Sequence, residues 1–429
     1  MMTIVLVSFA VMLIIGTPIA FVLGLAGLIA LLTTSGRSFL FLVPQQIFSG
    51  MDSYVLMAIP FYCLAGELMN ALGISERIIK LANALVGHFK GGLGHVNCLE
   101  SAMFAGISGS AAADVAGMGT ILIPAMTDSG YSKPYATAIT AATSVVGPTI
   151  PPSIPMVVFG SAVGVSVAGL FASGILPGLL MTALMMVVNH MISARRGYQA
   201  YAGNFSWTRL KEAVREGILA LVMPVIIIGG ILGGIFTPTE AAAVAVGYAL
   251  LVGGLAFKTL NPKVLWDVLK RTVYTTGVSL LLVSMGGVLS WVLAAEQIPA
   301  ALASFLMGIS TSRSLFMVYS CIFLLIVGCF MDLTAAIIIL APILTPVAVR
   351  LGVNPLHFGA VMVIALNIGL ITPPVGGVLF VACAVGRESI ENVMREIWPF
   401  VLCLIAALAV VAFSENFVLV VPRLLGLAG

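Results

Sequence analysis

The chain has 429 residues, of which 61% are hydrophobic and only 8% are charged, and its formal net charge is +3. Because a soluble globular protein carries roughly 25% charged residues, this composition excludes a soluble protein and predicts an integral membrane protein. No basic patch with interleaved aromatic residues is present, which excludes nucleic-acid binding. The sequence also lacks the phosphate loop G-x-x-x-x-G-K-[ST], the H-E-x-x-H helix and the G-x-S-x-G elbow, which argues against an ATPase and against an intramembrane enzyme.

The first predicted element is an apolar run from Ile4 to about Leu32. It is longer than a signal-peptide core and lacks a charged n-region, so it predicts a permanent membrane helix. A second long stretch, residues 134–194, contains no charged side chain. Since about 20 apolar residues span the bilayer core, the chain predicts an all-α membrane protein with about 11 transmembrane helices.

Residues 74–90 combine charged and apolar side chains at helical spacing. Arg77 and Lys80 alternate with Ile78 and Leu81, which is typical of an amphipathic helix lying in the membrane interface. A surface connector is the alternative that the pattern supports equally well.

Two loops carry most of the basic residues, one between Arg195 and Arg215 and one between Lys258 and Arg271. The positive-inside rule predicts that both face the cytoplasm. Residues 217–257 must therefore cross the membrane an even number of times. We expect two spans, interrupted at Thr237-Pro238-Thr239-Glu240.

An internal repeat appears when residues separated by 222 positions are compared. The two windows cover residues 95–164 and 317–386, and the matches fall on glycine and proline. The matching residues are Pro124, Gly130, Gly147, Pro151, Pro152 and Gly164, which correspond to Pro346, Gly352, Gly369, Pro373, Pro374 and Gly386. We expect the two halves of the chain to fold alike.

Each repeat contains a diproline that interrupts an apolar helix. The segments are residues 147–152, GPTIPP, and residues 369–374, GLITPP. Paired prolines remove amide donors and clash with the preceding turn. Unsatisfied backbone groups cost several kcal/mol each in lipid, so a broken helix persists only where it faces protein, water or a ligand. Two matched breaks are the pattern expected at a transporter's binding site.

Each repeat also contains two apolar arms joined by a short turn of small or polar residues. The first pair covers residues 95–128 and the second covers residues 324–349. Neither has a connecting loop long enough to lie outside the membrane, so we expect two re-entrant helical hairpins. If they enter from opposite faces, the halves are inverted repeats.

Sodium prefers oxygen ligands, as other hard cations do, and hairpin turns and unwound helices supply them. We expect at least one sodium site in each repeat, so two or more ions. The candidates in the first repeat are Ser108, Gly109, Ser110, Asp114, Thr143, Ser144, Gly147 and Thr149. The candidates in the second are Met331, Asp332, Thr334, Asn367, Gly369 and Thr372.

Half-helix N-termini at the same places would attract a carboxylate, because free amides and the helix dipole favour negative charge. The candidate substrate-binding residues are Ser108, Pro148, Thr149, Pro151, Pro152, Pro373 and Pro374. Small residues are also common where membrane helices pack closely, so the hairpin turn by itself favours packing. Its partnership with a matched break favours ligand binding.

Buried acids are expensive in a membrane, at least about 2.5 kcal/mol each on insertion scales, which favours a function for Asp114 and Asp332. Four glutamates have the same cost but no partner in the repeat, so helix capping or pairing between helices is as well supported as function. They are Glu67, Glu100, Glu240 and Glu296. The four histidines and six cysteines have no metal-ligand spacing.

We expect five regions. Residues 1–92 and 166–316 form the scaffold, residues 93–165 and 317–386 are the two transport segments, and residues 387–429 form a C-terminal arm.

Five motifs together resemble the large membrane subunit of tripartite ATP-independent periplasmic (TRAP) transporters, over essentially the whole chain. They are residues 60–69, PFYCLAGELM; 104–114, FAGISGSAAAD; 147–155, GPTIPPSIP; 234–241, GIFTPTEA; and 369–376, GLITPPVG. They are long and occur in the expected order.

The resemblance implies a sodium-coupled importer of the elevator type in the bacterial inner membrane, with an inverted-repeat fold similar to the ion transporter superfamily and no use of ATP. It implies a small organic acid as substrate, either sialic acid or a C4-dicarboxylate. It also implies two partners, a soluble periplasmic substrate-binding protein and a small four-helix membrane subunit. Because Met1 begins at the first large-subunit helix, we expect the small subunit to be a separate chain. The ion ligands implied are Ser108, Ser110, Asp114 and Asp332, together with the two breaks.

Two alternatives remain open from the residues. One is a self-sufficient ion-coupled dicarboxylate transporter that needs no binding protein. The other is a scaffold or channel-like subunit without alternating access.

Overall fold

The computed structural model describes residues 7–9, 11–12, 15–34, 40–201, 205–295, 312–373 and 376–427, without the side chains of residues 106–108 and 294. This described part of the chain is built of helices joined by turns and short loops. Within it, seven helices are long and apolar enough to cross a membrane, and four shorter apolar helices accompany them. The helical fold and the approximate number of helices agree with the prediction.

The first half of the chain contributes helices up to α10. Their bounds are α2 Ile19–Thr34, α3 Leu42–Met51, α4 Ala58–Ala71, α5 Ile74–Val86, α6 Gly92–Ser108, α7 Ala111–Asp128, α8 Lys133–Ser144, α9 Ile154–Val163 and α10 Val167–Arg196. The second half follows. Its helices are α11 Trp207–Leu232, α12 Pro238–Leu251 with the π-helix η2 Val252–Ala256, α13 Pro262–Ala295, α15 Arg313–Phe330, α16 Leu333–Arg350, α17 Pro355–Gly369, α18 Gly377–Gly386, α19 Ile390–Phe413 and α20 Glu415–Leu424.

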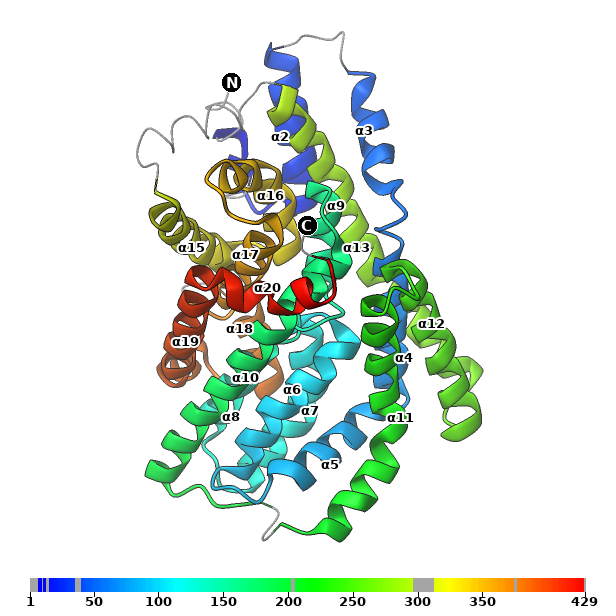
Figure 1. Ribbon diagram of the computed structural model, residues 1–429, viewed down its shortest axis with the longest axis vertical. Coiled ribbons are helices and arrows are strands. Elements are labelled where there is room, and N and C mark those ends of the chain that lie inside the picture. The colour runs from blue at the N-terminus through cyan, green and yellow to red at the C-terminus, as the bar shows by residue number, and fades with distance from the viewer. Residues whose placement is uncertain are drawn as a thin grey trace.

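The internal repeat is visible in the helix boundaries, because α7 and α16 start and end 222 positions apart. Helices α6 and α7 form hairpin 1, and α15 and α16 form hairpin 2. In Figure 1 hairpin 1 occupies the lower half of the molecule and hairpin 2 the upper half. The two hairpins therefore approach the centre from opposite ends, as expected for inverted repeats.

The two repeats exchange helices across the centre of the molecule. Helix α18 of the second repeat packs against α7 of hairpin 1, and α9 of the first repeat packs against α16 of hairpin 2. The long helices α10 and α19, which follow the two repeats, also pack against the opposite repeat. Helix α19 packs against α8, and α10 packs against α17. Neither repeat can therefore keep its packing without the other.

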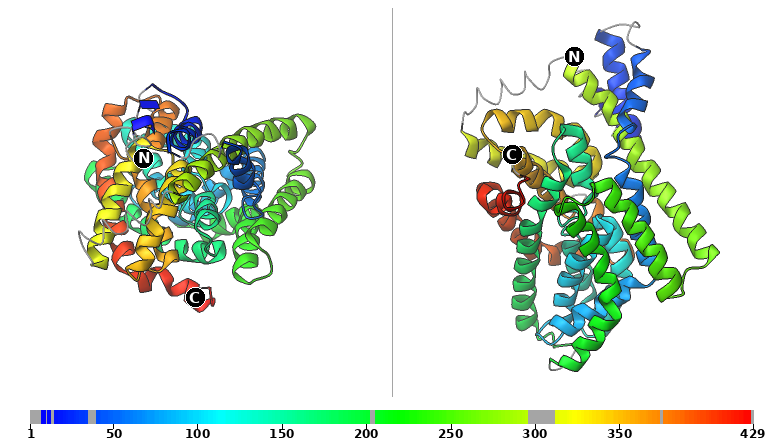
Figure 2. Two further views of the ribbon diagram at one scale, coloured as in Figure 1. Left: turned by 90° about the horizontal axis from the view of Figure 1, so that it is seen from above. Right: turned by 45° about the vertical axis from the view of Figure 1, so that its right-hand side comes forward.

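The remaining helices form a layer at one side of this body. Helix α13 packs against α2, α3 and α4, helix α12 packs against α4, and helix α11 packs against α5 and α12. Figure 2 shows α12 and α13 standing away from the repeats, with α2 and α3 at the upper end. Helix α13 also contacts α16, so this layer touches hairpin 2 directly.

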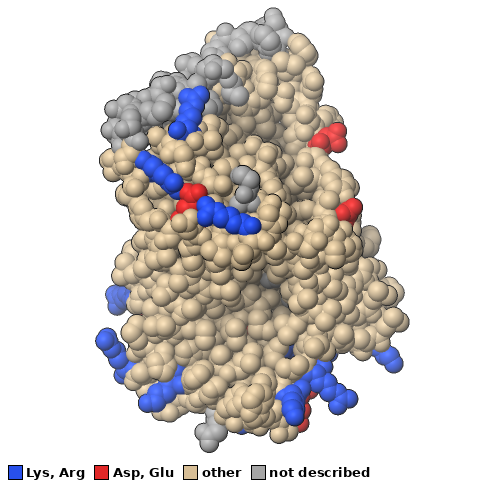
Figure 3. All heavy atoms as spheres, viewed as in Figure 1, with Lys and Arg blue, Asp and Glu red and all other residues tan. Residues whose placement is uncertain are grey.

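The basic residues indicate the orientation in the membrane. On the face shown in Figure 3, most Lys and Arg side chains lie toward the lower end of the molecule, where Figure 1 places the connection between α10 and α11, and a smaller group lies in the upper half beside acidic side chains. The connection between α12 and α13 lies in the lower half of the same view. By the positive-inside rule this end faces the cytoplasm, so hairpin 1 enters from the cytoplasmic side.

Helix α5 is amphipathic, as its sequence indicates. Its apolar face, which includes Ile78 and Leu81, is buried against α6 and α11. On its polar face Lys80 pairs with Glu216 at 2.9 Å, and the Arg77 guanidinium lies 3.6 Å from the centre of the Phe257 ring. Helix α5 thus connects α4 to hairpin 1 and holds α11 against it.

Candidate functional site

The tips of both hairpins and both helix breaks meet at one central cavity of about 1050 Å³. We call residues 145–153, between α8 and α9, break 1, and residues 370–376, between α17 and α18, break 2. The cavity is lined by Gly109 and Ser110, which we call tip 1, and by Pro148 at break 1. In the second repeat it is lined by residues 329–334, which we call tip 2, and by Leu370 at break 2. Helices α2, α4 and α13 close the opposite wall.

Tip 1 touches the backbone of break 1. Gly109 adopts φ +57° at the turn, a conformation that costs glycine little. A Cβ atom at Gly109 would lie 2.8 Å from the Pro152 carbonyl oxygen, so only glycine allows this approach. The next residue, Ser110, caps α7 by accepting a hydrogen bond from the Ala113 amide at 3.4 Å.

Break 1 contains the two prolines that the sequence singled out, and the Pro151-Pro152 peptide bond is cis. The Ser153 hydroxyl donates to the Pro148 carbonyl oxygen and accepts from the Met156 amide at 3.3 Å. Ser153 therefore ends the break and begins α9. On the side away from tip 1, Gly174 of α10 lets that helix approach the Thr149 carbonyl, where a Cβ atom would lie at 2.1 Å.

In the second repeat the hairpin also comes close to the backbone of the broken helix, here through Gly328 and Gly369. A Cβ atom on Gly328 would lie 2.4 Å from the Leu366 carbonyl oxygen, and one on Gly369 would lie 2.5 Å from the Cα atom of Gly328. The Gly376 amide then donates to the Cys329 carbonyl oxygen at 2.9 Å. Tip 2 is thus fixed to both ends of break 2.

Helix ends of both polarities surround the cavity. Its lining includes the first residues of α7, α9, α16 and α18, whose N-termini carry partial positive charge and favour an anion. It also includes Phe330, the last residue of α15, and Asn367, in the last turn of α17. The C-terminal carbonyls of these helices favour a cation. The cavity can therefore accept both an anion and a cation without many charged side chains.

Asn367 is the side chain of the lining that most clearly indicates a ligand. It is 0% exposed, and neither its Oδ1 nor its Nδ2 atom has a hydrogen-bond partner among the described residues. An unpaired buried amide costs about 1–3 kcal/mol, so a polar partner is expected here. Asp332 lies at tip 2, where its Oδ1 accepts from the Thr334 amide at 2.9 Å and so caps α16.

The predicted site residues fall into two sets. Those that line the cavity are Gly109, Ser110, Pro148, Met331, Asp332, Thr334 and Asn367. Those that lie outside this lining are Asp114, Thr143, Ser144, Gly147, Thr149, Pro151, Pro152, Gly369, Thr372 and Pro373. Ser108 ends α6, but its side chain is outside the described atoms, and Pro374 lies outside the described residues.

Several of the residues behind the lining already have partners. The Thr143 hydroxyl donates to Asn97 Oδ1 at 2.8 Å, and Asn97 Nδ2 donates to the Thr140 hydroxyl at 2.7 Å. The Ser144 hydroxyl donates to the Ala141 carbonyl at 2.8 Å, and the Thr372 hydroxyl to the Ile368 carbonyl at 2.6 Å. These hydroxyls stabilise α8 and α17 where each helix ends.

The four glutamates take different roles. Glu240 completes a capping box with Thr237 at the start of α12, at the place where the sequence predicted the interruption between the two spans. Glu67 approaches Arg271 at 3.9 Å, and both line the cavity. Glu100 is buried and neither of its carboxylate oxygens has a described hydrogen-bond partner. Glu296 lies outside the described residues.

Sequence reasoning missed the wall that faces the two tips. Arg271 carries the one guanidinium or ammonium group among the described residues of the lining, and Asn70, Tyr274, Thr275 and Ser279 add polar atoms beside it. Arg271 was assigned to a cytoplasmic loop because basic residues predict topology. Arg271 instead lies within the first third of the long helix α13, where its side chain, which is 70% exposed, borders the cavity.

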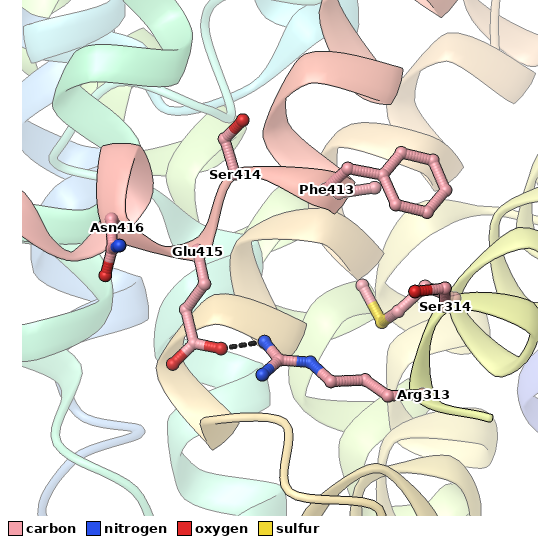
Figure 4. A pocket seen from close by; sticks show the side chains of 8 residues that line it. Arg313, Ser314, Phe413, Ser414, Glu415 and Asn416 are labelled. Carbon is pink, nitrogen blue, oxygen red and sulfur yellow. Dashed lines mark hydrogen bonds and ion pairs between the residues drawn. The ribbon is translucent and has the colours of Figure 1, made fainter. Parts of the chain in front are cut away.

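A second pocket of about 600 Å³ lies between the start of α15 and the junction of α19 with α20. Figure 4 shows the Arg313 guanidinium pointing at the Glu415 carboxylate, and the two form an ion pair. Arg423 also approaches Glu415, at 4.0 Å. Because these charges pair with one another, the pocket is a polar joint between helices.

Three comparisons with known proteins agree with one another. The family model described as "Tripartite ATP-independent periplasmic transporter, DctM component" matches residues 6–417. The chain is 40% identical to the sialic acid TRAP transporter large permease protein SiaM of Vibrio cholerae, over 95% of each chain. It is 38% identical to the C4-dicarboxylate TRAP transporter large permease protein DctM of Pseudomonas aeruginosa, again over 95% of each.

A third relative is the isethionate TRAP transporter permease protein DctMQ of Oleidesulfovibrio alaskensis, which is 38% identical over 94% of this chain and 64% of that protein. Among solved structures, the fold is similar to that of the Alcanivorax borkumensis YdaH transporter, with a TM-score of 0.57 and 15% identity over 90% of each chain. That likeness concerns the fold alone.

Proposed function

The chain belongs to the DctM family of tripartite ATP-independent periplasmic transporters, and from this premise we propose that it imports a small organic acid together with sodium ions. As a family member it is a multi-pass permease of the bacterial inner membrane and not an enzyme. The observation that carries the proposal is the meeting of two hairpin tips and two broken helices at one cavity.

Sodium would bind where helix C-termini and tip oxygens meet. In the second repeat the unpaired Asn367 amide lines the cavity, as do Asp332 and Thr334 of tip 2. In the first repeat Ser110 and Pro148 line the cavity next to the unwound carbonyls of break 1. Both sets are rich in the oxygen ligands that hard cations prefer, which supports at least one ion in each repeat.

The organic acid would bind where the four helix N-termini point into the cavity. Arg271 supplies the complementary full charge from α13, and its pairing with Glu67 at 3.9 Å is loose enough to exchange for a substrate carboxylate. Relatives named for sialic acid and for C4-dicarboxylates are about equally similar. We propose a substrate from one of these two classes.

The transport cycle proposed is an elevator motion. The repeats interlock through α7, α9, α16 and α18, so the tips and breaks would move as one body against the layer of α2, α3, α4 and α13. Substrate would be delivered by a periplasmic binding protein, as the family description suggests. A small membrane subunit would complete the transporter, which the greater length of DctMQ supports.

Uptake in proteoliposomes tests the function. The chain is reconstituted with its binding protein and small subunit, and labelled sialic acid and C4-dicarboxylates are offered under an inward sodium gradient. We expect one substrate class to accumulate with sodium and not with potassium. Equal uptake under both gradients would contradict sodium coupling, and uptake by the chain alone would favour the self-sufficient transporter.

Accessibility tests the motion. The six free cysteines, of which Cys63 and Cys329 line the cavity, are first replaced by serine. A single cysteine at Ser110 should then react with a membrane-impermeant thiol reagent from the cytoplasmic side in one state and from the outer side in another. Reaction from one side under all sodium and substrate conditions would support a channel-like or scaffold subunit instead.

A further inference from the structure

Two carboxyl groups lie inside hairpin 1, away from the central cavity. Glu100 on α6 is 0% exposed and Asp114 on α7 is 2% exposed, and neither lines the cavity. The two groups interact electrostatically. Asp114 faces α6, because Ser101 of that helix hydrogen-bonds to it, and Glu100 directly precedes Ser101.

These acids lack the partners that buried carboxylates normally have. The Ser101 hydroxyl donates to Asp114 Oδ2 at 2.9 Å. Asp114 Oδ1 and both oxygens of Glu100 have no hydrogen-bond partner among the described residues. Nor does any described Lys, Arg or His form an ion pair with either group. Burying one unpaired carboxylate is already costly, and two of the same sign are worse.

The second repeat shows that a hairpin of this shape does not need the acids. At the offset of 222 positions, Glu100, Ser101 and Asp114 correspond to Ile322, Phe323 and Ala336. The second arms, α7 and α16, nevertheless have the same length, and a two-residue connection joins the arms in both hairpins, although Gly109 in the first turn is left-handed and Met331 in the second is extended. The hairpin fold therefore does not require the carboxyl pair. A bound ligand would explain why two groups that are costly to bury are present.

We propose that Glu100 and Asp114 bind a sodium ion inside hairpin 1, with Ser101 orienting the Asp114 carboxylate. This inference rests on the proposed sodium coupling and adds an ion site outside the cavity. A proton would join the two carboxyls through a short hydrogen bond, and the structure has none between them. A sodium ion needs only oxygen ligands around it, so it can be held by carboxyl oxygens that do not hydrogen-bond to each other.

A sodium ion at this position would act on the hairpin as a whole. It would join α6 to α7 through oxygens from both arms and neutralise charge that otherwise repels across them. The neighbouring Asn97 bonds to Thr140 and Thr143 already join α6 to α8. Ion binding would therefore stiffen the element that carries tip 1 without occupying the substrate cavity.

The test measures the thermal unfolding midpoint of the purified chain in lipid nanodiscs. Sodium chloride replaces choline chloride at constant ionic strength, and the slope of stability against log sodium concentration counts the ions bound. For Glu100→Gln we expect a higher midpoint without sodium and a slope lower by one ion. The double variant Glu100→Ile/Asp114→Ala, which copies the second repeat, should behave in the same way.

Glu76→Gln on the exposed face of α5 is the matched control and should leave the slope unchanged. A wild-type slope that Glu100→Gln does not alter would overturn this inference and leave sodium coupling standing. Stabilisation of the wild type by acid, lost in Glu100→Gln without any role for sodium, would also overturn it. No sodium effect on any variant would overturn both this inference and the proposed function.

Discussion

Hairpin 1 and hairpin 2 share a backbone plan but carry their polar groups in different places. Hairpin 1 keeps acids in its interior, at Glu100 and Asp114, and caps its second arm with a serine. Hairpin 2 has no buried acid among its described residues and caps its second arm with Asp332, which is exposed at the tip. Ser110 and Asp332 occupy equivalent positions in the repeat, so Asp114 and Asp332 do not. The shared features are the glycine contacts and the breaks.

This difference teaches that backbone geometry and side-chain chemistry are separable in the two halves. Turns, glycine approaches and diproline breaks shape the cavity in both repeats. The charged and amide groups are then distributed unequally, with carboxyls inside hairpin 1 and Asn367 with Asp332 at the cavity in the second repeat. Variants made at matching positions of the two repeats can test whether the repeats also have different roles in transport.

Replacing both prolines of break 1 should have the largest effect. Proline disfavours a helix interior by about 3 kcal/mol relative to alanine, and Pro151→Ala/Pro152→Ala removes both prolines. The helix should extend and withdraw the carbonyls that face tip 1. We expect uptake to be lost while the chain still inserts, measured as transport per inserted protein. Normal uptake would show that the break is not needed for transport.

The glycine contacts should differ between the repeats. A Cβ atom on Gly369 would lie 2.5 Å from the backbone of hairpin 2, whereas the nearest atom to one on Gly147 lies at 3.1 Å. Overpacking costs typically 1–3 kcal/mol, so Gly369→Ala should lower the unfolding midpoint clearly and Gly147→Ala much less. Thermal denaturation of both variants measures the difference. Equal losses would mean that tip 2 is not held more tightly than tip 1.

Substitutions at two buried asparagines should have different effects, one on stability and the other on sodium binding. Asn97 hydrogen-bonds to Thr140, Thr143 and the Met126 sulfur, so Asn97→Ala should destabilise the chain by about 1–3 kcal/mol. Asn367 makes none within the described structure, so Asn367→Ala should leave stability nearly unchanged. It should raise the sodium concentration for half-maximal uptake about tenfold, equivalent to about 1.4 kcal/mol. An unfolding penalty at Asn367 with unchanged sodium dependence would assign it to packing.

Much of this architecture was predictable from residues whose effect is local. Proline pairs interrupt a helix wherever they occur, and the offset of 222 positions located both breaks and both hairpins. The tripeptide Thr237-Pro238-Thr239 with Glu240 predicted the start of α12, because a capping box needs only four consecutive residues.

What the sequence could not predict depends on contacts between distant segments. Nothing near Arg271 indicates that it faces tip 1 and tip 2 across a cavity, because its partners come from α4 and both hairpins. Thr143 was grouped with the ion ligands by its position near break 1, while its hydroxyl bonds to Asn97 on another helix. Glu100 could not be separated from a capping or paired glutamate until its surroundings were known.

The smallest effect is expected where the breaks differ in how the next helix begins. Ser153 caps α9 through its hydroxyl, whereas Gly376 begins α18 with φ +63° and no side-chain cap. Ser153→Ala removes the cap and also the bond to the Pro148 carbonyl, so it should cost about 1–2 kcal/mol with uptake largely retained. Gly376→Ser should not add a cap, because an N-cap needs extended backbone angles, and should instead destabilise break 2 through its positive φ. Stabilisation by Gly376→Ser in thermal denaturation would show that the two breaks are more alike than their geometry indicates.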